Sequence, residues 1–152
     1  MNSTVEQELE QKGWCLVRTK GHSMDPMLHE RISSVRLTKQ NGMPKKWDVA
    51  LYVRGDGAMV LHRVIRVNGD EYIFCGDHTV ALEHVRADQI IGTVEGFFPD
   101  ETEKYIAADS PEYRRYYRAW WLKWAWRRAY AYGSRVKRFI LGNVKRITGN
   151  TG

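Results

Sequence analysis

Four side chains of types that take part in hydrolytic chemistry are spread over the first 83 residues: Ser23, His62, Asp77 and Glu83. A serine hydroxyl becomes a nucleophile when a neighbouring base takes its proton. An imidazole titrates near neutral pH and suits that task. A serine in a turn or a histidine in a strand is nevertheless structural far more often than catalytic. Residue type alone therefore leaves both roles open.

The surrounding segments narrow the choice. Residues 21–28, GHSMDPML, resemble the nucleophile motif GxSMxPxL of signal peptidase I and the related LexA-like peptidases. Further segments resemble the family's strand GDVVLY, its general-base strand, its GDN segment and the approach to its last strand, in that order: WDVALY (47–52), VLHRV (60–64), GDH (76–78) and IIG (90–92). The resemblance covers about residues 14–96. It is specific because chance would have to satisfy all the matches together.

The resemblance implies Ser23 as nucleophile, with its backbone N–H in the oxyanion hole, and His62 as general base. Histidine rather than lysine at this position is similar to the endoplasmic-reticulum, archaeal and sporulation-type enzymes. A carboxylate should orient the imidazole and stabilise its cation. Asp77 matches the GDN aspartate, and Glu83 stands where the His subgroup has a second acid; we favour Glu83 as orienter and Asp77 as support, and keep both. The expected substrate pocket comprises Met24, Pro26 and Met27.

The reaction implied is that of a serine endopeptidase that cleaves a leader or signal-like peptide in a precursor. No cofactor is expected, and no metal, because neither Cys15 nor Cys75 lies in a CxxC pair. A catalytically silent peptide-binding or membrane-surface module on the same fold is the alternative. A LexA-type DNA-binding regulator is disfavoured because no helix-turn-helix pattern precedes the strand-rich region.

Short strand-like runs at regular spacing predict a mainly β region over residues 14–98. The resemblance refines this to a signal-peptidase/LexA-like antiparallel domain over 1–98. A capping box from Ser3 to Glu6 predicts a helix over about 4–12 that Gly13 ends. Turn residues at 55–57 and 68–70 predict two successive hairpins. Residues 77–89 are expected to form a loop, and 99–112 a linker.

The remaining chain, within the predicted linker and tail of 99–152, has a different composition. Residues 1–110 hold 13 Lys/Arg against 17 Asp/Glu, whereas residues 111–152 hold 11 against one. Ser110 before Pro111 predicts a helix start, and Gly133 a stop, with a second helix over 134–147. The tail is the basic part of the chain, so its partner is expected to be anionic.

Three roles are open for the aromatic stripe that the first tail helix would carry, namely Tyr113, Tyr117, Trp120 and Trp124. It could pack on the β domain, lie in the headgroup region of an anionic membrane, or bind nucleic acid or an acidic partner. We favour the membrane, and nucleic acid least. The expected contact residues are Trp120, Trp121, Trp124, Arg114, Arg118, Arg127 and Arg128.

The first residues lack the apolar run of a secretory signal peptide, and no stretch of 18 apolar residues occurs. We therefore expect a cytoplasmic protein that can lie against the inner face of a membrane.

Overall fold

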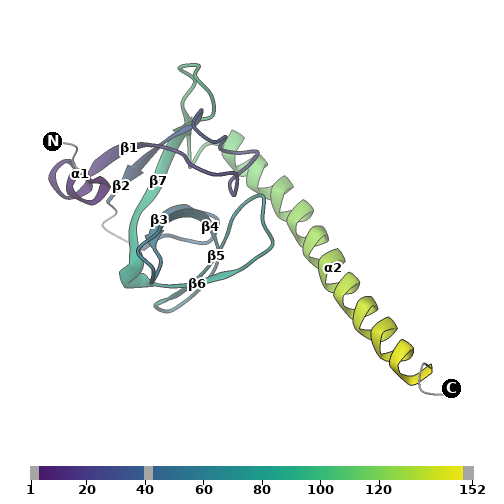
Figure 1. Ribbon diagram of the computed structural model, residues 1–152. Helices are drawn as coiled ribbons and strands as arrows, with labels where there is room; N and C mark the ends of the chain where they lie inside the picture. Colours follow the sequence, from purple (N-terminus) through teal and green to yellow (C-terminus); the bar gives the residue numbers. More distant parts are fainter. Residues whose placement is uncertain (1–3, 40–42, 149–152) are drawn as a thin grey trace.

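The computed structural model describes residues 4–39 and 43–148, and their side chains except at 136 and 138–148. Within these residues the strands form one eight-stranded antiparallel sheet in the order β1-β2-β7-β3-β4-β5-β6, with β8 paired to β7 (Figure 1). The strands are β1 (Trp14–Arg18), β2 (Ser34–Thr38), β3 (Val49–Val53), β4 (Met59–Asn68), β5 (Glu71–Cys75), β6 (Glu83–Arg86), β7 (Ile90–Phe98) and β8 (Ile106–Ala107). The mainly β prediction is confirmed.

Both predicted hairpins are present, because their turns contain residues that adopt the required backbone angles. Gly57 has a φ of 85° between β3 and β4, and Gly69 has a φ of 57° between β4 and β5. The β3–β4 register pairs Ala50 with His62. Successive residues of a strand point to opposite faces, so His62 and Arg63 are directed to different surroundings.

The N-terminal helix α1 (Val5–Lys12) and its cap lie one residue later than predicted at this end. Thr4 is the N-cap, and its capping box is with Gln7, whereas Ser3 lies outside the described residues. Gly13 ends the helix in the left-handed conformation, with a φ of 75°, as predicted. Leu9 of α1 is buried in the core of the β domain.

Two segments predicted to be irregular contain short strands. Within 77–89, β6 pairs with β5, and a 3-10 helix follows over Ala87–Gln89. Within 99–112, β8 pairs with the end of β7. These strands bury few residues of their own and form because a neighbouring strand offers unpaired backbone groups, which a local apolar pattern does not reveal.

The tail is a single helix, α2 (Pro111–Thr148), and not two. Ser110 caps it, accepting a hydrogen bond from the N–H of Tyr113 at 3.1 Å, as predicted. The predicted stop at Gly133 is wrong, because one glycine costs a helix only about 1 kcal/mol, too little to end it. The sequence also predicts that Val136, Phe139, Ile140, Val144 and Ile147 share one helix face, and these side chains lie outside the described ones. Figure 1 shows α2 leaving the β domain and extending well beyond it.

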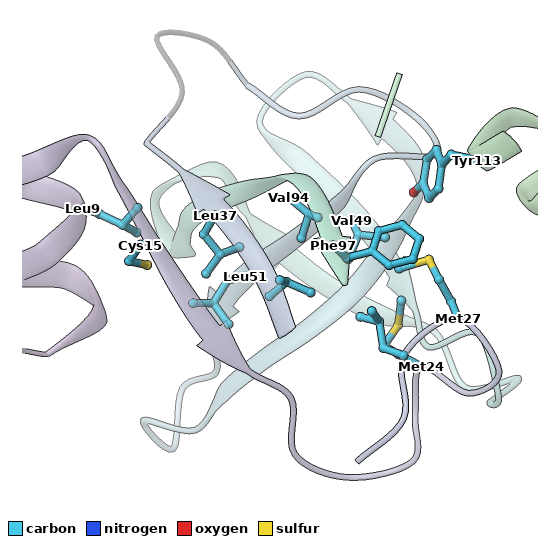
Figure 2. Packing of buried hydrophobic residues seen from close by; sticks show 12 residues of the cluster. Leu9, Cys15, Met24, Met27, Leu37, Val49, Leu51, Val94, Phe97 and Tyr113 are labelled. Carbon is cyan, nitrogen blue, oxygen red and sulfur yellow. The ribbon is translucent and has the colours of Figure 1, made fainter. Parts of the chain in front are cut away.

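The largest hydrophobic cluster lies among β1, β2, β3 and β7 (Figure 2). It includes Met24 and Met27 from the segment after β1 and Tyr113 from the start of α2. The turn that carries Ser23 is therefore anchored in the core by the methionines that follow it. No helix among the described residues has the length and apolar character needed to cross a bilayer.

Candidate active site

A cleft of about 630 Å³ in the β domain is lined by three of the predicted catalytic residues, Ser23, His62 and Glu83. They come from the turn after β1, from β4 and from the start of β6. Apolar and edge-strand residues complete the lining, among them Val17, Lys20, Leu28, Leu51, Met59 and Leu61. The fold therefore gathers in one cleft three catalytic candidates that are up to 60 positions apart in the chain.

Gly76 shows how close Ser23 and His62 come. A Cβ atom placed on Gly76 would lie 3.0 Å from Nε2 of His62 and 3.1 Å from Cβ of Ser23. The serine side chain and this imidazole nitrogen therefore face the same small space. Within the described residues no hydrogen bond joins the Ser23 hydroxyl to His62. Such bonds are often long in substrate-free enzymes and tighten when substrate binds.

The other imidazole nitrogen, Nδ1, faces Tyr52 and Glu83. It lies 3.2 Å from the Tyr52 hydroxyl and 3.4 Å from a carboxylate oxygen of Glu83. The Tyr52 hydroxyl donates a hydrogen bond to Glu83 at 2.9 Å, so toward His62 it can only accept a hydrogen bond from Nδ1. The arrangement favours the tautomer in which Nδ1 carries the proton, which leaves the lone pair on Nε2, the nitrogen beside Gly76.

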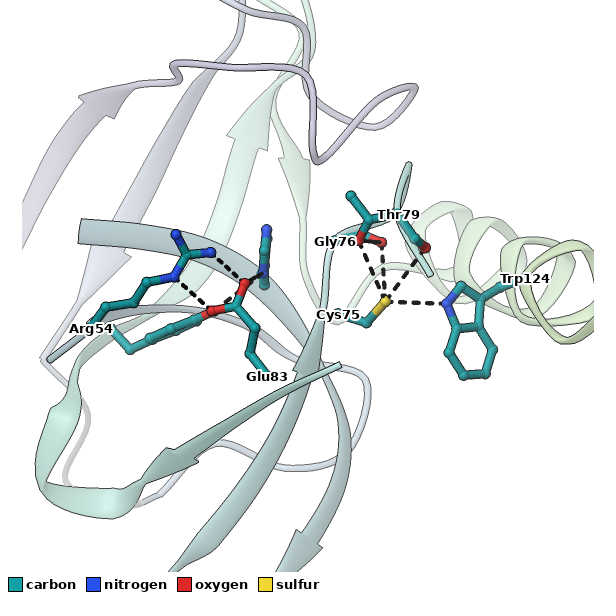
Figure 3. Close-up of polar contacts among 8 residues, drawn as sticks. Arg54, Cys75, Gly76, Thr79, Glu83 and Trp124 are labelled. Atoms are coloured by element: carbon teal, nitrogen blue, oxygen red, sulfur yellow. Dashed lines mark hydrogen bonds and ion pairs between the residues drawn. The ribbon is translucent and has the colours of Figure 1, made fainter. Parts of the chain in front are cut away.

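Arg54 holds the carboxylate of Glu83 in place (Figure 3). Its Nε donates to one carboxylate oxygen at 2.7 Å, and its terminal nitrogen pairs with the other. Hydrogen bonding by Arg54 lowers the pKa of Glu83. Glu83 is therefore ionised at neutral pH and can stabilise a cation on the imidazole.

Burial lowers the pKa of His62 from the ordinary 6.5, and the charge of Glu83 partly offsets that effect. The His62 side chain is 7% exposed. At neutral pH the imidazole is therefore in its neutral form, which is the form that accepts a proton.

Asp77 has different partners. Its carboxylate accepts two hydrogen bonds from Arg63, both at 2.7 Å, and a third from the Tyr116 hydroxyl at 2.9 Å. The side chains of Asp77 and Arg63 are fully buried. Within the described residues no hydrogen bond joins Asp77 to His62. Of the two acids kept open by the sequence, Glu83 is the one beside the imidazole, and Asp77 belongs to a buried ion pair.

The backbone around Ser23 is held by the segment after Gly76. The N–H of His78 donates to the carbonyl of Ser23 at 2.8 Å. Among the described residues the N–H of Ser23 has no hydrogen-bond acceptor, and its place in an oxyanion hole stays a prediction.

The predicted pocket residues separate in the structure. Met24 lines the cleft. Met27 is buried with its sulfur 3.1 Å from Arg63, and Pro26 is exposed and outside the lining, so neither forms the pocket. Met27 packs in the core and Pro26 is exposed to solvent.

Three residues of the site were not predicted. Tyr52 and Arg54 lie two positions apart along β3 and its turn, a spacing that places them on one face and could have indicated a shared role. Gly76 precedes Asp77, and a glycine at this position could have indicated that other residues approach its backbone closely.

The tail residues predicted to contact a membrane or an anionic partner also fall into buried and exposed groups. Trp120 and Trp124 are buried against the β domain. The indole N–H of Trp120 donates to the Asp77 carbonyl, and that of Trp124 donates to the Cys75 sulfur (Figure 3 shows the latter). Arg127 and Arg128 donate to the carbonyls of His78 and Val80. Trp121 is half-buried, and Arg114 and Arg118 are exposed. Packing on the β domain is therefore the role of this part of the stripe, and Trp120 and Trp124 are not available as surface contacts.

These contacts place residues 75–80 between α2 and the cleft. The same short segment contains Gly76, beside Ser23 and His62, and Asp77, beside α2. The helix therefore supports one wall of the site.

Across the described residues, no group of three or more His, Cys, Asp or Glu side chains is placed to hold a metal ion. No family model matches the chain, and no curated protein matches it. The geometry of the cleft is therefore the basis for a functional conclusion.

Proposed function

We propose that the chain is a serine endopeptidase of the signal-peptidase type that cleaves a leader or signal-like peptide. One observation carries the proposal: the Ser23 side chain and Nε2 of His62 face the same space beside Gly76, while Nδ1 faces Glu83 and Tyr52. This is the order nucleophile, base and orienting acid that acyl transfer to a serine requires.

In the proposed reaction, rotation of the Ser23 side chain brings its hydroxyl to Nε2 of His62. The imidazole takes the proton as the serine oxygen attacks the peptide carbonyl carbon. The N–H of Ser23 stabilises the resulting oxyanion, and Glu83 stabilises the imidazolium. His62 then gives the proton to the leaving amine, and the acyl-enzyme forms. A water molecule then attacks the ester as His62 takes its proton, and His62 passes that proton to the Ser23 oxygen as the peptide acid leaves.

The cleft supports a peptide as substrate. The edge strand β1 has no partner on its outer side among the described strands, and residues 17–21 continue from it into the lining of the cleft. A peptide in extended conformation could pair with such an edge. The apolar lining near Ser23, including Leu28 and Leu61, would accept an apolar side chain of the substrate.

Full-length protein incubated with a peptide library, with products identified by mass spectrometry, tests the proposal. We expect cleavage by the wild type, and loss of at least about 1,000-fold of the rate in Ser23→Ala and in His62→Ala. Ser34→Ala and His84→Ala are the matched controls, since neither residue lines the cleft. Undiminished cleavage by Ser23→Ala would refute the proposal.

A catalytically silent peptide-binding module is the second candidate. The missing hydrogen bond between Ser23 and His62 in this conformation favours it. Binding assays separate the two: a silent module binds peptide equally well in the wild type and in the Ser23→Ala variant, and neither protein releases product.

A further inference from the structure

The outward face of α2 carries three large, exposed apolar side chains. Leu122, Trp126 and Tyr130 are 71%, 69% and 69% exposed. They are spaced four residues apart and share one side of the helix. Trp120 and Trp124 lie two positions from them, on the opposite side, and pack on the β domain. The helix therefore has a second apolar face, here called the outer stripe (Leu122, Trp126 and Tyr130).

The outer stripe continues into a shallow aromatic pocket at the base of the helix. The pocket has a volume of about 400 Å³ and is lined by Trp47, Tyr117, Arg118, Trp121 and Leu122. The ammonium group of Lys46 lies 4.6 Å from the ring centre of Trp47 and 5.6 Å from that of Trp121. Leu122 thus belongs to both surfaces and joins them into one apolar strip edged by cations.

The charge on this helix is unbalanced. Glu112 is its only acid, and it pairs with Lys104 of the β domain. Within the described residues, no cation of α2 has a carboxylate partner. Arg127 and Arg128 donate to backbone carbonyls of the β domain, and six others make no ion pair or hydrogen bond there: Arg114, Arg115, Arg118, Lys123, Arg135 and Lys137. Residues 1–110, by contrast, have more acidic than basic side chains. Whatever covers the outer stripe must therefore be apolar at its centre and anionic around it.

We propose that the outer stripe and its flanking cations bind the surface of a bilayer that contains anionic lipid. Tryptophan and tyrosine are enriched at the level of the lipid headgroups, and leucine inserts below them. Each lysine or arginine near an anionic surface adds to the attraction. Figure 1 shows α2 extending beyond the β domain, and the three side chains of the outer stripe are exposed. A nucleic acid would use the cations and rings but would leave Leu122 without an apolar partner.

The docked helix would also set the position of the cleft. Arg127 and Arg128 hold the carbonyls of His78 and Val80, in the segment that leads into the lining residues Thr79 and Ala81. A bilayer on the outer stripe would therefore lie on the far side of the helix from the cleft wall. Binding at this surface does not depend on peptidase activity.

Flotation with vesicles of phosphatidylcholine, with and without phosphatidylglycerol, tests the proposal on the full chain carrying Ser23→Ala. We expect binding to the anionic vesicles that weakens as salt rises. Neutralising Arg115, Lys123 and Arg118 with glutamine should lower the partition coefficient about 100-fold. The matched control replaces three exposed cations of the β domain, Arg31, Arg66 and Arg86, with glutamine and should leave binding unchanged.

Replacing the outer stripe itself, by Leu122→Ser, Trp126→Ser and Tyr130→Ser, should lower vesicle binding at least about 10-fold at constant charge. The side chains are exposed, so the fold is retained, and circular dichroism checks this. Equal binding by this variant and the parent would overturn the proposal. Tighter binding to a single-stranded oligonucleotide than to anionic vesicles, at the same salt concentration, would assign the surface to nucleic acid instead.

Discussion

Replacement of Gly76 by alanine would place a methyl group in the space shared by Ser23 and His62. The new Cβ would lie 2.5 Å from the Ser23 carbonyl oxygen, closer than real Cβ contacts allow, and 3.0 Å from Nε2 of His62. The carbonyl is backbone and is also held by the N–H of His78 at 2.8 Å. The strain therefore cannot be relieved by a side-chain rotation, and the turn that carries Ser23 has to move.

The size of the effect follows from this contact. Restoring a contact of 3.0 Å requires a displacement of about 0.5 Å, and a misplacement of about 1 Å can cost a reaction about 100-fold. We expect kcat to fall about 10- to 100-fold in Gly76→Ala. Crowding of a packed site costs about 1–3 kcal/mol of unfolding free energy. Steady-state cleavage of a peptide found in the library screen, together with urea unfolding, measures both quantities.

Two other glycines provide controls. A Cβ on Gly55 would contact nothing within 4 Å, so Gly55→Ala should change neither activity nor stability. A Cβ on Gly92 would lie 3.0 Å from the Thr38 carbonyl, outside the cleft lining, so Gly92→Ala should lower stability and spare kcat. Wild-type kcat in a folded Gly76→Ala protein would refute the assigned proximity of Ser23 and His62.

Three further predictions concern the charged groups. Because burial lowers the pKa of His62, the acid limb of kcat/KM should lie below pH 6.5. The free energy of unfolding should also fall as the pH drops below 6.5, because the unfolded chain binds the His62 proton more readily than the folded chain does. Glu83→Gln should move this limb to lower pH and Arg54→Gln to higher pH, because the two charges act on the His62 pKa in opposite directions. Asp77→Ala should cost about 3–5 kcal/mol in urea unfolding, because it leaves the buried charge of Arg63 unpaired.

A specific outcome would contradict each of the three predictions. An acid limb above pH 6.5, or limbs that shift the same way in the two variants, would contradict the assigned surroundings of His62. Glu71→Gln, which removes an exposed carboxylate paired with His84, is the control for Asp77→Ala and should cost less than about 1 kcal/mol. Equal losses in the two variants would contradict a structural role for Asp77.

Local chemistry in the chain was enough to predict the hairpins, the end of α1 at Gly13 and the start of α2 after Ser110. Each depends on a few adjacent residues whose backbone preferences or capping hydrogen bonds act within one turn. The candidates Ser23 and His62 came from short ordered motifs and did not require knowledge of the strand pairing.

The choice between Asp77 and Glu83 needed the folded chain. Both acids follow His62 at plausible spacings, but β6 pairs with β5 and brings Glu83 to Nδ1, while Arg63, on the opposite face of β4, takes Asp77. The role of the aromatic stripe on α2 was equally open, because tyrosine and tryptophan suit both a protein core and a membrane surface. Contacts between residues distant in the chain select one acid and one helix face, and no local preference carries that information.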